Sequence, residues 1–180
     1  MHSDLIGKIE KARYYANEPE RVVFTQLTAT FRGGNNGHTI TLIEDRWLCD
    51  CAAFRLHGTC AHTMAMQKLL APMLSEAARA DVPLTLQSDL ISMIEKSRHY
   101  IHEPERVCFS SLQARFRGSN NDHTVTLSDE SWLCDCTTFR LHQTCAHTMA
   151  LQRILRVMLS DAALQPANAL IESTMVSALT

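Results

Sequence analysis

Two groups of cysteine and histidine residues have the spacing of metal ligands. The first is Cys49-Asp50-Cys51, followed after eight residues by Cys60-Ala61-His62. The same spacing recurs in a second group, whose candidate ligands are Cys134, Cys136, Cys145 and His147. Three thiolates and one imidazole form a complete tetrahedral ligand set for Zn²⁺, and six of the seven cysteines are used in this way. The sequence therefore predicts two zinc ions per chain.

The predicted zinc ions are expected to be structural, because four protein ligands leave no coordination position for water. Elsewhere the sequence shows no Gly-rich phosphate loop, nucleophile–base arrangement or pair of catalytic carboxylates. We therefore expect a protein that is not an enzyme. His57 and His142, each three residues before the third cysteine of its group, are the alternative histidine ligands.

The two groups belong to two copies of one unit. Residues 3–78 align without a gap on residues 88–163, and 49 of the 76 aligned positions are identical. This period is too long for a solenoid repeat and indicates a duplicated small domain. The predicted organisation is a first zinc module at 1–80, a linker at 81–87, a second zinc module at 88–163 and a C-terminal tail at 164–180 with a weak helical pattern.

Each copy is predicted to fold as a helix, a β-meander, a zinc loop and a second helix, which makes the protein α+β. Strands are predicted at 21–31, 38–42 and 46–49, with a tight turn at residues 35–37. The last helix is predicted from residue 60 to about residue 74. Pro72 should bend or end it, whereas Val157 lets the equivalent helix of the second copy continue. The apolar face of the first helix is predicted to comprise Leu5, Ile6, Ile9, Ala12 and Tyr15.

Composition and charge limit the classes of function. The 180 residues are 46% hydrophobic and 20% charged, which is typical of a globular protein. The formal net charge is −2, and each zinc site of three thiolates adds about one further negative charge. This balance argues against unspecific coating of nucleic acid. No export signal or membrane span is apparent, so we expect a cytoplasmic protein with reduced cysteines and no membrane contact.

The zinc loop and its flanks resemble the SWIM zinc finger, whose signature is Cys-x-Cys, a variable gap and Cys-x-His. The resemblance covers about 20 residues per copy, from Trp47 to Ala65 and from Trp132 to Ala150. It implies His62 and His147 as the histidine ligands. It also implies binding to DNA or protein, as is generally thought for these domains. The duplicated form without an attached enzyme resembles stand-alone bacterial members.

Other conspicuous residues have simpler interpretations. Trp47 and Trp132 are expected to shield the zinc sites from water, and Phe54 and Leu56 to pack beneath the first metal. His38 and His123, next to the predicted hairpin turns, are expected on the surface. Tyr14, Tyr15 and Tyr100 are interpreted as packing residues, and Cys108, which replaces Val23 of the first copy, as a small buried hydrophobic residue.

Two functions from different classes are consistent with these features. The first is a protein-binding adaptor or regulator, in which two linked modules gain avidity. The alternative is a DNA- or RNA-binding regulator, and a weaker third is a zinc- or redox-responsive switch. Phosphate contacts would require basic residues around the zinc loops to converge on one face. The candidate contacts are Arg32, Arg46, Arg55, Lys68, Arg117, Arg140 and Arg153, with Arg115 and Arg156 nearby.

Overall fold

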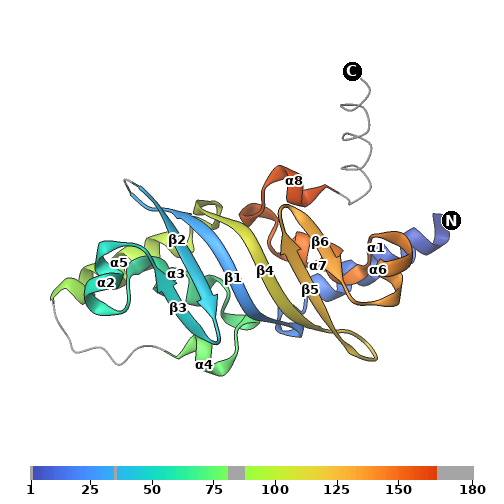
Figure 1. Cartoon of the computed structure of the whole chain (residues 1–180), viewed down its shortest axis with the longest axis horizontal. Coiled ribbons are helices and arrows are strands. Elements are labelled where there is room, and N and C mark those ends of the chain that lie inside the picture. Colours follow the sequence, from blue (N-terminus) through green and yellow to red (C-terminus); the bar gives the residue numbers. More distant parts are fainter. Residues whose placement is uncertain (1, 35, 81–87, 166–180) are drawn as a thin grey trace, which may run out of the picture.

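A computed structural model describes residues 2–34, 36–80 and 88–165 of the chain. It contains one antiparallel six-stranded sheet with helices, which confirms the predicted α+β class. The strand order is β3-β2-β1-β4-β5-β6. The first copy forms one half of this sheet and the second copy the other half (Figure 1).

The elements of the two copies correspond one to one. The first copy contains α1 (His2–Ala16), β1 (Val22–Arg32), β2 (Gly37–Ile43), β3 (Arg46–Cys49), α2 (Ala52–His57), α3 (Ala61–Leu69) and α4 (Glu76–Arg79). The second contains α5 (Ser88–Ile101), β4 (Val107–Arg117), β5 (Asp122–Ser128), β6 (Ser131–Cys134), α6 (Thr137–His142), α7 (Ala146–Ile154) and α8 (Asp161–Leu164).

The copies meet along β1 and β4, which pair in antiparallel register. Leu27 lies opposite Leu112, its own equivalent in the second copy, so a pseudo-two-fold axis passes between these residues. A bulge on each side of the axis is held by equivalent bonds. The Thr25 hydroxyl donates to the Gln113 carbonyl at 3.1 Å, and the Ser110 hydroxyl donates to the Thr28 carbonyl at 3.2 Å.

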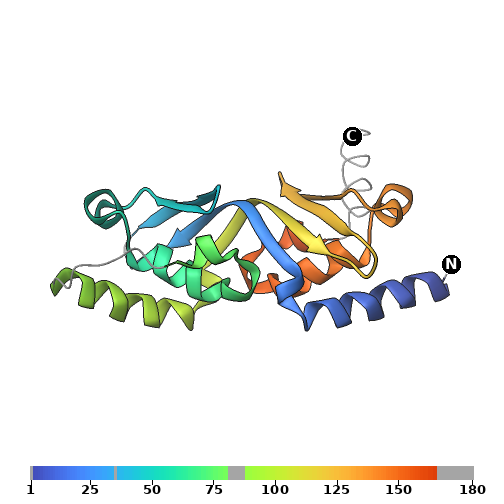
Figure 2. The same ribbon diagram turned by 90° about the horizontal axis from the view of Figure 1, so that it is seen from below.

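Alternation along the strands separates a buried face from an exposed face. On β1, Phe24, Leu27, Ala29 and Phe31 are buried, whereas the intervening polar residues are exposed or half-buried. The buried side chains pack on the helices, and Figure 2 shows α1, α3, α5 and α7 on this side of the sheet. No helix of the described residues lies across the other face, which we call the helix-free face.

The first helix of each copy packs on the helix that follows the zinc loop of the other copy. We call this helix, α3 or α7, the zinc-loop helix. The main helix partner of α1 is α7, and that of α5 is α3. In Figure 2 the blue α1 accordingly lies beneath the orange α7, and the yellow-green α5 beneath the teal α3. The two copies therefore share both a sheet and a helical layer.

Several local expectations were wrong. The zinc-loop helix ends at Leu69 in the first copy and at Ile154 in the second, so Val157 does not prolong it. In both copies a 3₁₀ turn follows, and a methionine and a leucine of this segment are buried in the core. Leu5 and Ile6 are about half exposed because the start of α1 extends beyond the second copy. Residues 81–87 and most of the predicted tail lie outside the described residues.

Candidate metal centres

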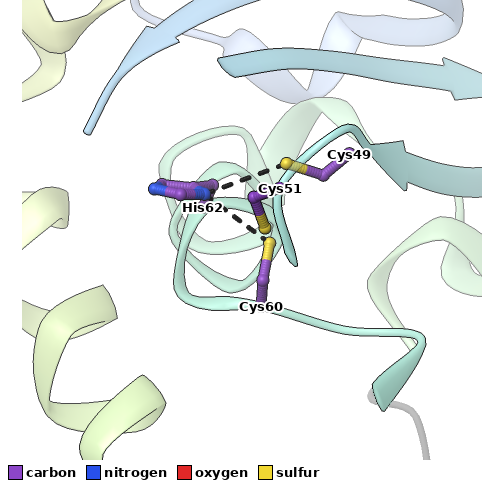
Figure 3. Close-up of side chains that lie close together, drawn as sticks. All are labelled: Cys49, Cys51, Cys60 and His62. Carbon is purple, nitrogen blue, oxygen red and sulfur yellow. Dashed lines mark hydrogen bonds between the residues drawn. The ribbon is translucent and has the colours of Figure 1, made fainter. Parts of the chain in front are cut away.

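The predicted ligands of each copy lie together in a buried cluster. All ligand atoms of one cluster lie within 4.8 Å of one another. Figure 3 shows the three sulfur atoms of the first cluster turned toward His62. The clusters consist of Cys49, Cys51, Cys60 and His62, and of Cys134, Cys136, Cys145 and His147. His57, the alternative ligand, lies at the end of α2 outside the cluster.

The spacing of the ligand atoms fits a zinc ion. In the first cluster, Nδ1 of His62 lies 3.8 Å from Sγ of both Cys49 and Cys60. In the second, Nδ1 of His147 lies 3.7 and 3.8 Å from its two sulfur neighbours. Zinc bonds of about 2.3 Å to sulfur and about 2.0 Å to nitrogen place ligand atoms roughly 3.5–3.8 Å apart in a tetrahedron. Each cluster therefore fits one zinc ion, which gives two per chain.

The ligand cysteines of each cluster lie at the ends of secondary-structure elements. Cys49 is the last residue of β3, and Cys51 caps the start of α2, where its Sγ accepts the Phe54 N–H at 3.4 Å. Cys60 caps α3 in the same manner and accepts the Thr63 N–H at 3.5 Å. Helix N-termini favour negative charge, so both positions suit thiolate ligands. The short helix α2 was not predicted, and it makes the zinc loop compact.

The surroundings of the three thiols in each cluster shift their pKa values in opposite directions, and the hydrogen bond to Cys60 raises the pKa of Cys49. A hydrogen bond from the Cys49 thiol, with help from His62 and Thr63, holds the pKa of Cys60 far below its ordinary value. The same arrangement around Cys134 and His147 lowers the pKa of Cys145. Burial raises the pKa of Cys51. A zinc ion displaces the protons of thiol ligands as it binds.

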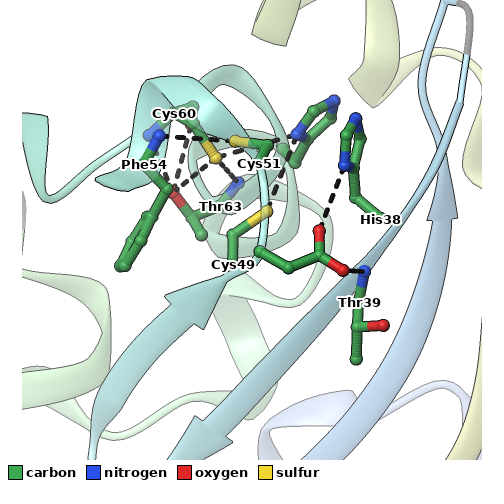
Figure 4. A network of polar contacts seen from close by, with 9 residues as sticks. His38, Thr39, Cys49, Cys51, Phe54, Cys60 and Thr63 are labelled. Carbon is green, nitrogen blue, oxygen red and sulfur yellow. Dashed lines mark hydrogen bonds and ion pairs between the residues drawn. The ribbon is translucent and has the colours of Figure 1, made fainter. Parts of the chain in front are cut away.

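A second layer of residues holds each ligand histidine. The imidazole of His38 lies 4.6 Å from that of His62, and its Nδ1 is 3.1 Å from the Asp50 carboxylate (Figure 4). Asp50 stands between two ligand cysteines and also accepts the Thr39 N–H at 3.0 Å. Chiefly this amide bond, and then the bond to His38, lower the pKa of Asp50. His38 is thus a half-buried residue that lies against the ligand His62 and also contacts Asp50.

The second site repeats this layer. The His123 ring lies 4.6 Å from His147, and its Nδ1 is 2.9 Å from Asp135. The carboxylate of Asp135 accepts the Thr124 N–H at 2.9 Å. The sequence contained a signal for this role, because an Asp stands between two ligand cysteines in both copies. Its partners could not be identified before the register of β2 on β3 was known.

Tyr15 and Tyr100 are the functional neighbours that the sequence did not reveal. The Tyr100 ring stacks on His62 at 5.6 Å and 15°, and the Tyr15 ring stacks on His147 at 5.6 Å and 12°. Each tyrosine belongs to the copy that does not hold the zinc ligand it covers. Both were correctly interpreted as packing residues. No local sequence signal, however, shows that α1 and α5 each pack on the opposite copy.

The candidate phosphate-contacting residues do not gather at the zinc loops. Arg32, Arg46 and Arg117 are exposed residues on the strands of the sheet. Arg55 and Arg140 lie on the short helices α2 and α6 at opposite ends of the molecule. Lys68 and Arg153 lie near the ends of α3 and α7 in the helical layer. The structure thus distributes these residues over three regions.

The structure adds a contact to the two tryptophans and corrects two other predicted roles. The indole N–H of Trp47 donates to the carbonyl of Ala78 in α4, and that of Trp132 donates to the carbonyl of Ala163 in α8. Each tryptophan therefore binds the last helix of its copy. Cys108 is exposed, because alternation along β4 directs it to the helix-free face. Leu56 is 77% exposed and does not pack beneath the metal site, whereas Phe54 contacts the core.

Among the described residues, no helix combines the length and hydrophobicity needed to cross a membrane. No protein-family model matches the chain, and no curated protein or solved structure is detectably similar to it.

Proposed function

We propose that this zinc-binding protein is a non-enzymatic interaction module, whose two structural zinc ions stabilise a sheet that binds a protein partner. The support for a structural role is the complete set of four buried protein ligands at each site. We assign the two copies to SWIM-type zinc fingers on the order and spacing of their ligands. The proposed location is the cytoplasm, where thiolate ligands stay reduced.

A groove on the helix-free face carries the proposal. It has a volume of about 250 Å³ and crosses β2, β1, β4 and β5. Thr28 on β1 and Ser111 on β4, which lie opposite each other beside the Leu27–Leu112 pair, both line it, so it lies on the pseudo-two-fold axis. No charged side chain lines this groove, and its walls offer hydroxyl and amide groups from Thr28, Thr126 and Gln113. Such a surface suits the polar backbone and side chains of a protein segment.

Acidic turns flank the groove and indicate the charge of the partner. Ile43 and Ser128, which line the groove, are followed directly by the exposed pairs Glu44-Asp45 and Asp129-Glu130. These pairs form the β2–β3 and β5–β6 turns with positive φ at both residues. Complementary charge steers association and selects partners. The proposed partner is therefore a protein segment that carries lysine or arginine side chains.

One observation favours nucleic acid as a second candidate. Arg32, Arg46, Arg115 and Arg117 are exposed on the strands of the same sheet. Arg115 lies 3.8 Å from the carboxylate of Asp122, which offsets part of this charge. Together with the acidic turns, this ion pair makes the face less suited to phosphates than to a basic peptide.

The zinc-loaded full chain can be tested with defined probes: a Lys/Arg-rich 12-residue peptide, an acidic peptide of the same length and a 20-bp DNA duplex. We expect saturable binding of the basic peptide alone. Asp129→Lys and the groove-blocking Thr126→Trp should each weaken it about tenfold, and the matched control Glu95→Lys on α5 should not. Preferential, strongly salt-dependent binding of the duplex would instead support the nucleic-acid candidate. If Glu95→Lys weakened binding of the basic peptide as much as Asp129→Lys does, the result would contradict the proposed surface.

A further inference from the structure

Each ligand histidine is covered by an aromatic ring from the opposite copy. Tyr100 stacks on His62 and Tyr15 stacks on His147, in both cases at 5.6 Å between ring centroids. Tyr15 is fully buried, and its hydroxyl group lies 2.8 Å from the Ser119 hydroxyl of the second copy. The contact is therefore part of the interface between the copies.

An arginine fastens each stack to the copy that holds the zinc ligands. The guanidinium group of Arg21 lies over the Tyr15 ring at 5.1 Å and donates to the Arg117 carbonyl at 3.2 Å. The guanidinium group of Arg106 lies over the Tyr100 ring at 5.3 Å and donates to the Arg32 carbonyl at 3.0 Å. Cation–π contact and the backbone bond thus fix the tyrosine relative to the opposite copy.

The stack restricts the orientation of the ligand ring. On the first site His62 contacts Phe31 at 5.1 Å and His38 at 4.6 Å, in addition to Tyr100. Its Nε2 approaches Gly33 so closely that a Cβ atom there would lie 3.2 Å away. The ring is thereby held with Nδ1 toward the sulfur atoms, and groups that orient a metal ligand commonly affect metal affinity 10- to 100-fold.

We infer that Tyr15 and Tyr100 are positioning residues for the zinc ligands of the opposite copy, so that each zinc site forms fully only when the two copies are packed together. Zinc at the second site then depends on α1, and zinc at the first site depends on α5. Neither copy holds its zinc ion as an independent finger. This dependence does not require that the proposed binding surface be correct.

The test measures zinc retention at each site separately in the full chain. The zinc-loaded protein is exposed to a competing chelator and a thiol-alkylating reagent, and the alkylation rates of Cys60 and Cys145 are followed by peptide mass spectrometry. Tyr15→Ala should accelerate alkylation of Cys145 about tenfold and that of Cys60 less than twofold. Tyr100→Ala should produce the reciprocal pattern.

Two further variants separate positioning from general loss of stability. Tyr15→Leu keeps apolar volume without the ring stack and should still accelerate alkylation of Cys145 selectively. Ile6→Ala removes an exposed apolar side chain from the same helix and should change neither rate. The inference would be overturned if Tyr15→Leu accelerated alkylation of Cys60 and Cys145 equally, or accelerated only that of Cys60 in its own copy. Wild-type alkylation rates in Tyr15→Ala would overturn it as well.

Discussion

At the scale of single residues, the zinc sites depend on close packing behind the ligands. His62 has Nδ1 toward the sulfur atoms and Nε2 against Gly33, where the absence of a side chain provides the space. The N–H of Gly33 also closes the hairpin by donating to the Asn36 carbonyl at 2.8 Å. A Cβ atom at position 33 would lie 2.9 Å from this carbonyl oxygen and 3.2 Å from the His62 ring. A side chain there would disturb both the hairpin and the ligand.

Gly33→Ala is therefore expected to destabilise the protein by about 1–3 kcal/mol, because the tight neighbours are backbone and a buried ring. Its zinc should also be lost at lower chelator concentration. Denaturant titration and metal analysis measure the two effects. Gly34→Ala is the matched control, since a Cβ atom there meets nothing within 4 Å and should leave both quantities nearly unchanged. Similar behaviour of the two variants would contradict this account of the site.

At the scale of elements, the short helix between the ligand pairs determines the shape of the zinc loop. A ligand, Cys51 or Cys136, caps its start, and a residue in the left-handed conformation caps its end. In the first copy this residue is Gly58 with φ 68°, and in the second it is Gln143 with φ 55°. A residue with a Cβ atom is strained there, whereas glycine is not. The second zinc loop therefore contains a strain that the first avoids.

Exchange of these two residues tests the difference. Gln143→Gly should raise the free energy of unfolding by about 0.5–1 kcal/mol, and Gly58→Gln should lower it by a similar amount. The second change introduces no clash, because the space around Gly58 is open. Chemical denaturation of the zinc-loaded variants gives both values. Effects of the same sign at the two positions would contradict an explanation based on backbone conformation.

At the scale of the whole molecule, the duplication forms one body rather than two neighbouring fingers. Strands β1 and β4 join the halves of the sheet, and α1 and α5 each cover the zinc-loop helix of the opposite copy. The core is one continuous cluster of buried residues. Loss of one zinc ion should therefore affect both copies.

Cys49→Ser provides this test. Metal content should fall from two zinc ions per chain to one, and amide protection should decrease in Val107–Arg117 as well as in Val22–Arg32. Hydrogen exchange with mass spectrometry detects the change. Cys108→Ser, at the exposed cysteine outside the clusters, should retain both zinc ions and full protection. Loss of protection confined to the first copy would show that the copies unfold independently.

Much of the local structure could be predicted because its causes are local. The spacing of Cys49, Cys51, Cys60 and His62 reflects ligand chemistry, and the structure places their side chains in one buried cluster. The strands were predicted within one or two residues, since alternation and turn residues are readable along the chain. Errors occurred where packing decides the outcome. Cys108 is exposed because only one face of the sheet is covered, and the zinc-loop helix ends early so that the following turn can fill the core.

By itself, the sequence determined that the chain contains two related zinc sites, because metal ligation requires particular residue types at particular spacings. Only the tertiary structure decided how the sites are completed. Pairing of β1 with β4 makes a common sheet, exchange of α1 and α5 brings Tyr15 and Tyr100 onto the ligands of the opposite copies, and one face of the sheet is left without helices. These contacts join residues that are 38 positions apart for Tyr100 and His62 and 132 positions apart for Tyr15 and His147. Their stability comes from burial between surfaces that no local pattern specifies.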